Sequence, residues 1–256
     1  MKDNGADVKW IITFMKTYGE INEDFLISVQ QTKDGGYILA GSTESFGSGW
    51  LIKTDRKGNE VWSKTYGGND YDIFRTLQQT KDCGYILAGC TDCSVARNSD
   101  VWVIKTDEKG NEVWSKIYGG NDYDMIYSVQ QTKDGGYILA GHTQSNGIGG
   151  EGWIIKVDKN GNEQWSKDFG VNDEYYEIFS AQQTKDGGYI MAGRAELETY
   201  NSEIFYGWLL KVDSNGNEQW SKTFGDNVGN TINSVQQTKD GGYTSWKYKI
   251  LGFGKI

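Results

Sequence analysis

The sequence predicts an all-β fold, a five-bladed β-propeller built of four-stranded antiparallel blades, and two observations carry that prediction. The string QQTKDGGY occurs five times, with Cys83 replacing one glycine in the second copy. The copies are roughly 50 residues apart, a period typical of propeller blades and other repeat architectures. Each full unit also holds four short runs rich in Val, Ile, Thr, Tyr and Trp, bounded by glycine and by acid or amide residues. Four such antiparallel strands make one blade.

The first unit shows where each strand is expected. Its four runs cover residues 27–32, 37–43, 50–54 and 60–66, and none is long enough for a helix. The turns between them contain glycines that accept a positive φ. The second glycine of each QQTKDGG string is never replaced, so we expect it to carry a backbone requirement, and we predict structural roles for Gly36, Gly84, Gly136 and Gly188. The glutamine pairs before these turns are expected to form hydrogen bonds between blades, because buried amides require partners.

The two ends of the chain predict how the blades close. The fifth unit begins near Thr231 and loses the ILAG pattern after Tyr243. At the other end, residues 16–19 match residues 64–67, which end the first unit. We therefore expect the N-terminal strand to pair with strands from residues 231–256 and to close the ring, which would remove exposed strand edges. No low-complexity linker interrupts the repeat, so residues 1–256 are predicted to form a single propeller domain.

Composition and charge exclude several functions. The formal net charge is -9, which disfavours non-specific binding to nucleic acid or to an anionic membrane. No apolar stretch approaches the length of a membrane span, and the first ten residues are largely polar. We therefore expect neither membrane insertion nor a signal peptide in this sequence, and we expect a monomer.

The three cysteines lie in the second unit, and an odd number cannot pair completely within one chain. Cys90 and Cys93 have the CxxC spacing. A redox or zinc site would need a partner pair or a βαβ context, and neither is visible. We interpret them as variable-loop cysteines and predict no metal site from them.

One part of the repeat resembles a known family. The string IKTDxxGNExW, at residues 52–62 and 104–114 with close variants at 155–165 and 210–220, resembles the tryptophan-docking repeat of quinoprotein-like propellers. The whole unit is also similar to bacterial and archaeal propeller-repeat proteins that carry QTxDGGYIxAG and DxxGNxxWxKTFGG and are often parts of surface or secreted proteins. The resemblance covers nearly the entire chain and implies a propeller fold and an extracellular or cell-surface location. It also implies inter-blade packing for Trp62, Trp114, Trp165 and Trp220.

The loop between the second and third strands is where the units differ in length. It runs from the AG glycine to the Trp of the next strand, over residues 41–50, 89–102, 141–153 and 193–208. Variable loops on a rigid scaffold usually carry binding, and in an up-and-down blade they share a face with the connections to the next blade. We therefore predict a ligand site on that face. Its candidate residues are Asn69, Asp70, Tyr71, Asp72, Asn121, Asp122, Tyr123, Asp124, Asp173 and Tyr175.

Two interpretations of these connections stay open. Tyr rings with carboxylates and amides suit sugar recognition, because an aromatic face stacks on the C–H surface of the ring while polar groups hold hydroxyls. They would also suit a cation, so calcium is a weaker candidate and no other cofactor is expected. Ordinary turn chemistry explains the same residues, since Asn and Asp side chains bond nearby backbone N–H groups. Residues 213–218 superficially resemble a calcium loop but are interpreted as a hairpin turn.

Near-identical blades also shape the expected function. Catalysis needs unlike groups in unlike environments, and repeated blades supply like groups. The single histidine, His142, excludes a three-histidine zinc site. We therefore expect a non-catalytic binding module with a glycan as its ligand. The alternative is a structural or protein-interaction module of a surface protein, and a glycoside hydrolase is a weaker alternative because no unique pair of carboxylates stands out.

Overall fold

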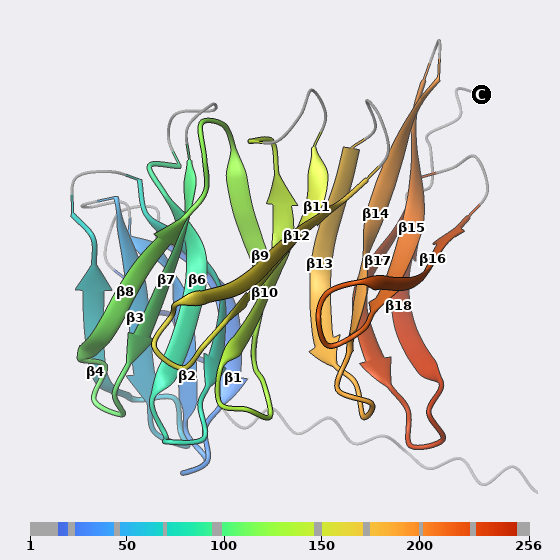
Figure 1. Cartoon of the computed structure of the whole chain (residues 1–256). Coiled ribbons are helices and arrows are strands. Elements are labelled where there is room, and N and C mark those ends of the chain that lie inside the picture. The colour runs from blue at the N-terminus through green and yellow to red at the C-terminus, as the bar shows by residue number, and fades with distance from the viewer. Residues whose placement is uncertain are drawn as a thin grey trace, which may run out of the picture.

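The structure is a computed structural model that describes residues 15–19, 24–43, 47–68, 71–93, 99–145, 150–170, 175–199, 202–225 and 229–249. Every regular element in these residues is a β-strand. The strands form five antiparallel sheets that stand side by side, here called blades 1 to 5 in chain order (Figure 1). Within the same residues, no helix is long and apolar enough to span a membrane.

The first four blades each have four strands in sequence order. Blade 1 is β1 (Phe25–Gln31), β2 (Tyr37–Thr43), β3 (Ser48–Thr54) and β4 (Glu60–Tyr66). Blade 2 is β5 (Ile73–Gln79), β6 (Tyr85–Thr91), β7 (Asp100–Thr106) and β8 (Glu112–Tyr118). Blade 3 is β9 (Asp124–Gln131), β10 (Tyr137–Thr143), β11 (Glu151–Val157) and β12 (Glu163–Phe169). Blade 4 is β13 (Tyr175–Gln183), β14 (Tyr189–Thr199), β15 (Ser202–Val212) and β16 (Glu218–Phe224), and blade 5 is β17 (Asn230–Gln237) with β18 (Tyr243–Lys249). The predicted four-strand unit is therefore confirmed.

The first strand of each blade forms the inner edge of the array. β1, β5, β9, β13 and β17 contact one another in sequence, and from β5 onward each also contacts the second strand of the preceding blade. The fourth strands have no comparable mutual contacts among the described residues, so they form the outer edge. The inner strands are where side chains of successive blades come closest together.

A β-bulge on each inner strand explains the glycine of the ILAG motif. In blade 3, Ala140 pairs with Ser128 and Gly141 pairs with Ile126, so Tyr127 is the extra residue of the bulge. The bulge brings the backbone of β9 so close to β10 that a Cβ on Gly141 would lie 1.8 Å from the carbonyl oxygen of Met125. A glycine is required there because no side chain fits. The same bulge occurs in the other blades and re-aims one inner-strand side chain in each.

The two glycines of each QQTKDGG hairpin serve different needs. Gly135 has φ +89 and open space around its Cβ position, and Cys83 occupies the equivalent position with φ 68. A Cβ on Gly136 would instead lie 2.3 Å from the carbonyl oxygen of Val157. The first position requires a positive φ, which Cys83 also adopts. The second position requires a glycine, because the third strand comes too close for a side chain. Gly36, Gly84 and Gly188 have the same contact with a backbone carbonyl.

Hydrogen bonds from the QQTK strings join each blade to the next. The backbone N–H of Gln79 donates to Gln30 Oε1 at 2.6 Å, and the backbone N–H of Lys33 donates to Gln79 Oε1 at 2.9 Å. Equivalent bonds connect the later blades. Each glutamine amide therefore satisfies a backbone donor of its neighbour, as expected from the sequence. This explains why the string is repeated in every unit.

The repeated tryptophans of the fourth strands contact the following blade. The indole of Trp62 lies edge-on to the ring of Tyr85, with centroids 6.1 Å apart. It also lies against Gly110, whose added Cβ would be 2.9 Å from the indole. Trp114, Trp165 and Trp220 have equivalent ring contacts with Tyr137, Tyr189 and Tyr243. All four are half-buried between blades.

The prediction of five four-stranded blades closed into a ring is wrong for the described residues. Blade 5 has two strands, and it makes no contact with blade 1 comparable to those between sequential blades. Figure 1 shows β1 and β18 well apart in the array. Leu26 and Val29 of blade 1 are consequently 37% and 64% exposed, whereas the equivalent Ile126 and Val129 of blade 3 are 0% and 6% exposed. Blade 5 departs from the repeat in its second strand, because β18 has the sequence YTSWKYK where the other blades carry the ILAG pattern or its variant IMAG.

Residues 15–19 nevertheless occupy the place of a preceding fourth strand. Tyr18 Oη donates to the carbonyl oxygen of Gly58 at 2.8 Å, and Lys16 Nζ donates to Asn59 Oδ1 at 3.1 Å. Tyr66 and Lys64 of β4 make the same two contacts with blade 2. The segment therefore packs on blade 1 as the end of a repeat unit, as its sequence predicted, although its pairing with residues 231–256 is not seen among the described residues.

Two of the three cysteines are bonded to each other. Cys90 and Cys93 form a disulfide at the end of β6, with their Cα atoms 5.9 Å apart, and Cys83 is free. Cys90 is fully buried. The CxxC spacing thus belongs to a structural bond that ties the variable loop of blade 2 to its strand, a pairing that the sequence alone did not decide.

Candidate functional site

The predicted ligand residues of the connecting segments separate into buried and exposed groups. Asp72 and Asp124 are buried, Tyr123 and Tyr175 are half-buried, and Tyr71, Asn121 and Asp122 are exposed. Asn69, Asp70 and Asp173 lie outside the described residues. The structure therefore does not present the ten candidates as one surface.

The buried acids of this set brace the connecting segments. The carboxylate of Asp124 accepts hydrogen bonds from the backbone N–H of Gly120 and from Ser145 Oγ, both at 2.9 Å. Its own backbone N–H donates to the carbonyl oxygen of Ser99 at 2.8 Å. Burial and the neighbouring Asp124 carboxylate raise the pKa of Asp100. Asp124 is thus engaged with the loop of the preceding blade, which is the turn chemistry that the sequence left open.

A second group of residues gathers where the blades differ from one another. The residue after the ILAG glycine is Ser42, Cys90, His142 or Arg194 in blades 1 to 4. The bulge residue of the inner strand varies too, and is Ile27, Arg75, Tyr127, Phe179 or Asn233. In blades 3 and 4, the residues at these positions contact Glu177 and two tyrosines. The group is here called the inner-strand cluster and consists of Tyr123, Tyr127, His142, Tyr175, Glu177 and Arg194.

His142 is at the centre of the cluster. Its imidazole is fully buried, and its ring centroid lies 5.1 Å from that of Tyr123, 5.9 Å from Tyr127 and 5.4 Å from Tyr175. Nε2 forms a hydrogen bond of 3.1 Å with the hydroxyl of Tyr175. Nδ1 faces Glu177 Oε1 across 3.7 Å, too far for a hydrogen bond. Three tyrosine rings therefore enclose the only histidine of the sequence.

Glu177 connects blade 3 to blade 4. Its Oε1 accepts a hydrogen bond of 3.1 Å from the hydroxyl of Tyr127, and its Oε2 forms an ion pair with Arg194 Nε. Blades 1 to 3 have Phe25, Ile73 and Met125 at the equivalent position, so this acid departs from an apolar repeat position. A buried carboxylate is stable there because both of its oxygens have partners.

Arg194 gives the cluster its positive charge, and Arg75 of blade 2 adds a second charge that acts on His142. The guanidinium of Arg194 lies over the ring of Phe205 at 4.5 Å and over that of Phe179 at 5.9 Å, and its side chain is part-exposed. Arg75 comes from the bulge of β5, and its Nε is buried without a hydrogen-bond partner among the described residues. Both charges act on His142 and oppose its protonation.

The imidazole and the phenols of the cluster are held in their neutral forms. Burial lowers the pKa of His142 to about 4, with smaller contributions from Arg194 and Arg75. Burial raises the pKa of Tyr127 and of Tyr175, and the Glu177 carboxylate adds to both effects. Near neutral pH the imidazole is uncharged and the phenols keep their protons. The cluster therefore combines aromatic faces, hydroxyl donors, a neutral imidazole and one carboxylate–guanidinium pair.

The described residues show no candidate metal centre. No group of three or more His, Cys, Asp or Glu side chains among them is arranged to hold a metal ion. In the hairpin at residues 213–217, Asp213 Oδ1 accepts hydrogen bonds from the backbone N–H groups of Asn215 at 2.8 Å and Asn217 at 2.9 Å. This segment is a turn closed by its own aspartate, as interpreted from the sequence.

Comparison with known proteins identifies the fold. No family model matches the sequence, and no curated protein matches it. A chain of the Kuenenia stuttgartiensis hydrazine synthase structure is similar, with a TM-score of 0.56 and 14% identity over 82% of this chain. The chain spans 58% of that hydrazine synthase chain. The likeness supports a propeller-type fold. It does not show the more specific resemblance to tryptophan-docking repeats, which stays a prediction.

Two further similar structures are enzymes by their titles. The endo-arabinase from Bacteroides thetaiotaomicron VPI-5482 has a TM-score of 0.47 and 12% identity, covering 92% of this chain and 96% of its own. The α-L-arabinofuranosidase from Lactobacillus brevis has a TM-score of 0.49 and 9% identity, covering 89% of this chain and 84% of its own.

The prediction that the chain is not an enzyme does not stand, because the structure overturns its premise. It rested on the premise that repeated blades supply only like groups. The inner-strand cluster shows why the premise is wrong. His142 and Arg194 occupy equivalent positions in blades 3 and 4, and Glu177 is paired with Arg194 where blade 3 has Met125, so equivalent positions carry different chemistry. Comparison of loop lengths missed Glu177, Arg194, Tyr127 and Arg75, because they lie within strands. Aligning the strands position by position would have found them.

Proposed function

We propose that the chain acts on carbohydrate and that a saccharide binds at the inner-strand cluster. The observation that carries this proposal is the convergence of unlike residues at the inner ends of blades 2 to 4, on a scaffold whose other positions repeat. Scaffold needs do not explain these residues, because blade 1 folds with Phe25, Ile27 and Ser42 in the same places. A ligand that contacts only this part of the array does explain them.

The chemistry of the cluster suits a sugar. Tyr123, Tyr127 and Tyr175 offer ring faces for the C–H surface of a pyranose or furanose, and their hydroxyls are donors and acceptors. The part-exposed Arg194 can donate to ring hydroxyls while Glu177 holds it in place. The imidazole and the phenols are neutral, and each can exchange hydrogen bonds with the uncharged hydroxyls of a sugar.

Cleavage of a glycosidic bond is a reaction to test at this site. Glycoside hydrolases use two carboxyl groups on either side of the scissile bond. Glu177 supplies one, and Glu196 pairs with Tyr175 in the register of β13 and β14, which places a second acid at the same end of the blade. The Cys90–Cys93 disulfide fits an oxidising compartment, so a secreted or cell-surface location belongs to the proposal.

The test is a titration of the purified chain with a panel of oligosaccharides by calorimetry, with release of reducing sugar measured on the same panel. Glu177→Gln should weaken binding at least about tenfold, because Arg194 loses its charged partner and its orientation. Glu112→Gln, in the exposed outer strand β8, is the matched control and should bind as the parent does. Equal binding by both variants would contradict the placement, and no binding or cleavage by the parent would contradict the function.

A further inference from the structure

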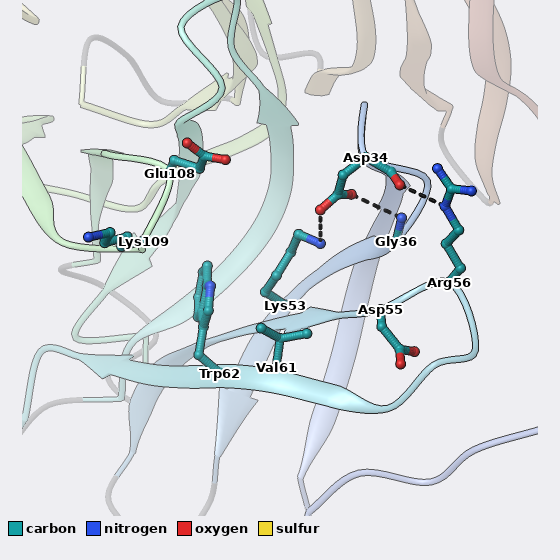
Figure 2. Close-up of a pocket in the computed structure, with 9 residues that line it drawn as sticks. All are labelled: Asp34, Gly36, Lys53, Asp55, Arg56, Val61, Trp62, Glu108 and Lys109. Carbon is teal, nitrogen blue, oxygen red and sulfur yellow. Dashed lines mark hydrogen bonds and ion pairs between the residues drawn. The ribbon is translucent and has the colours of Figure 1, made fainter.

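The inter-blade grooves at the hairpin end of the strands are a separate feature. One groove, with a volume of about 420 Å³, lies between blades 1 and 2 and is lined by Lys53, Val61 and Trp62 together with residues of the next blade (Figure 2). An equivalent groove of about 700 Å³ between blades 2 and 3 is lined by Lys105, Val113 and Trp114. Both volumes are in the range of small-molecule sites. They lie at the opposite ends of the strands from the inner-strand cluster.

Each groove contains a buried lysine with a hydrogen-bond donor that no residue in the described part of the chain uses. An ammonium group has three N–H donors. Lys53 Nζ donates to Asp34 Oδ2 at 2.9 Å and to the carbonyl oxygen of Thr54 at 2.8 Å, and Figure 2 shows the first of these bonds. Lys105 Nζ has the equivalent partners, Asp82 and the carbonyl oxygen of Thr106. The two lysines are 7% and 5% exposed, and neither has a third acceptor group among the described residues, so one donor of each is available within the groove.

In blades 3 and 4, a glutamine side chain of the protein accepts the third hydrogen bond of the equivalent lysine. Lys156 and Lys211 have the same two kinds of partner, and each also donates to a glutamine side chain of the fourth strand at 2.9 Å. These are Gln164 and Gln219. At the aligned positions blades 1 and 2 have Val61 and Val113, which are each 61% exposed. The valine thus leaves the lysine donor open and adds an apolar surface beside the tryptophan.

The charges and the apolar side chains that line the grooves indicate which class of ligand would bind there. Three carboxylates and three cationic side chains line each groove, so neither favours a highly charged ligand. An indole and a valine form an apolar wall, and the lysine needs an oxygen acceptor next to it. A sugar ring has both features, because one face presents C–H groups and its edge presents hydroxyls.

We propose that the grooves beside Trp62 and Trp114 are two saccharide-binding sites. The C–H face of the ring stacks on the indole and contacts Val61 or Val113, and a hydroxyl oxygen accepts a hydrogen bond from Lys53 or Lys105. The grooves after blades 3 and 4 do not bind in this way, because Gln164 and Gln219 take the donor. These sites go beyond the proposed function of the inner-strand cluster and do not depend on it.

The experiment follows the indole N–H signals of the ¹⁵N-labelled full chain during titration with methyl glycosides of glucose, galactose, mannose and arabinose. With at least one glycoside, the Trp62 and Trp114 signals should move and those of Trp165 and Trp220 should not. In the double variant Val61→Gln with Val113→Gln, the first two should stop moving. In Gln164→Val, which frees the donor of Lys156, the Trp165 signal should begin to move.

Three results would overturn the proposal. The first is that no glycoside moves the Trp62 and Trp114 signals, and the second is that all four signals move alike. The third is that the indole signals of the Val61→Gln/Val113→Gln double variant and of Gln164→Val move on titration as those of the parent do. The substitutions exchange residues that the chain already uses at aligned, exposed positions, so the variants are expected to fold, and their unchanged indole spectra without ligand would show it. Loss of binding at the inner-strand cluster would leave this readout unaffected.

Discussion

His142 is a titratable residue that is buried, and it is tolerated there because its imidazole stays neutral. Its imidazole is enclosed by tyrosine rings and faces two arginines, so its pKa falls to about 4 from the ordinary value of 6.5. Neutral imidazole keeps the hydrogen bond with Tyr175 while avoiding an uncompensated buried charge. Glu177 is stable for the complementary reason, since Arg194 and Tyr127 occupy its two oxygens. The site is thus held together by pairs of residues from different strands.

The pKa of His142 predicts a specific dependence of stability on pH. Because the folded pKa lies below the unfolded pKa, protonation favours the unfolded state, and this contribution to stability is fully present above pH 6.5. It should be lost as the pH falls from 6.5 to about 4, by roughly 3 kcal/mol at about 1.4 kcal/mol per pKa unit. Urea denaturation at a series of pH values measures it. His142→Phe should flatten the profile in this window, and an unchanged profile would contradict the assignment.

At the scale of the element, hairpins and bulges are specified by glycines with distinct tasks. The ILAG glycine accommodates the bulge of the neighbouring inner strand, while the second glycine of the QQTKDGG turn allows the third strand to approach. The glutamine amides then fix each hairpin to the next blade. These requirements recur in every unit, which explains why the sequence repeats there and varies elsewhere.

Two neighbouring alanine substitutions separate these requirements. Gly136→Ala should destabilise the protein by about 3 kcal/mol, because the new methyl group would overlap the carbonyl oxygen of Val157. Gly135→Ala should cost about 1 kcal/mol, since it meets open space and has only the positive φ to accommodate. Thermal denaturation of the two variants makes the comparison. Equal losses would show that close approach is not what fixes the second glycine.

Strands and turns could be predicted from sequence because they depend on local patterns. The four runs of the first unit lie within two residues of β1 to β4, and the repeated glutamines form the bonds expected of them. Ring closure could not be predicted in the same way, since it depends on how blade 5 packs on blade 1 through space. The inner-strand cluster was missed because Glu177 and Arg194 become neighbours only through the register of β13 and β14. A repeat comparison restricted to loops cannot show this.

In the whole molecule, the inner strand of blade 1 has apolar side chains that no other blade covers among the described residues. Blade 1 exposes Leu26 and Val29 on the face that every later blade buries against its predecessor. The tyrosine and lysine of residues 15–19 pack at the outer part of this blade, but the inner strand β1 stays uncovered by the described residues. The stability of the array therefore comes from contacts between sequential blades, as in other repeat proteins.

A matched pair of substitutions tests this open arrangement in solution. Val129→Thr should destabilise the protein by about 2 kcal/mol, because it places a hydroxyl in the buried contact between blades 2 and 3. Val29→Thr keeps the β-branched shape at the exposed equivalent position and should change stability by no more than about 0.5 kcal/mol. Chemical denaturation measures both. A large loss for Val29→Thr would show that another part of the protein, or a second copy, covers blade 1.

The repeats build the scaffold, and we propose that the departures from the repeat in blades 3 and 4 form the saccharide site. The most direct measurement compares saccharide binding by two proteins, both carrying Val61→Gln and Val113→Gln so that the grooves do not contribute. One keeps the inner-strand cluster, and the other also carries His142→Ser, Glu177→Met and Arg194→Ser, residues that other blades already have at these positions. We expect that both proteins fold and that only the first binds saccharide. Equal binding by the two proteins, or none by the first, would contradict this proposal.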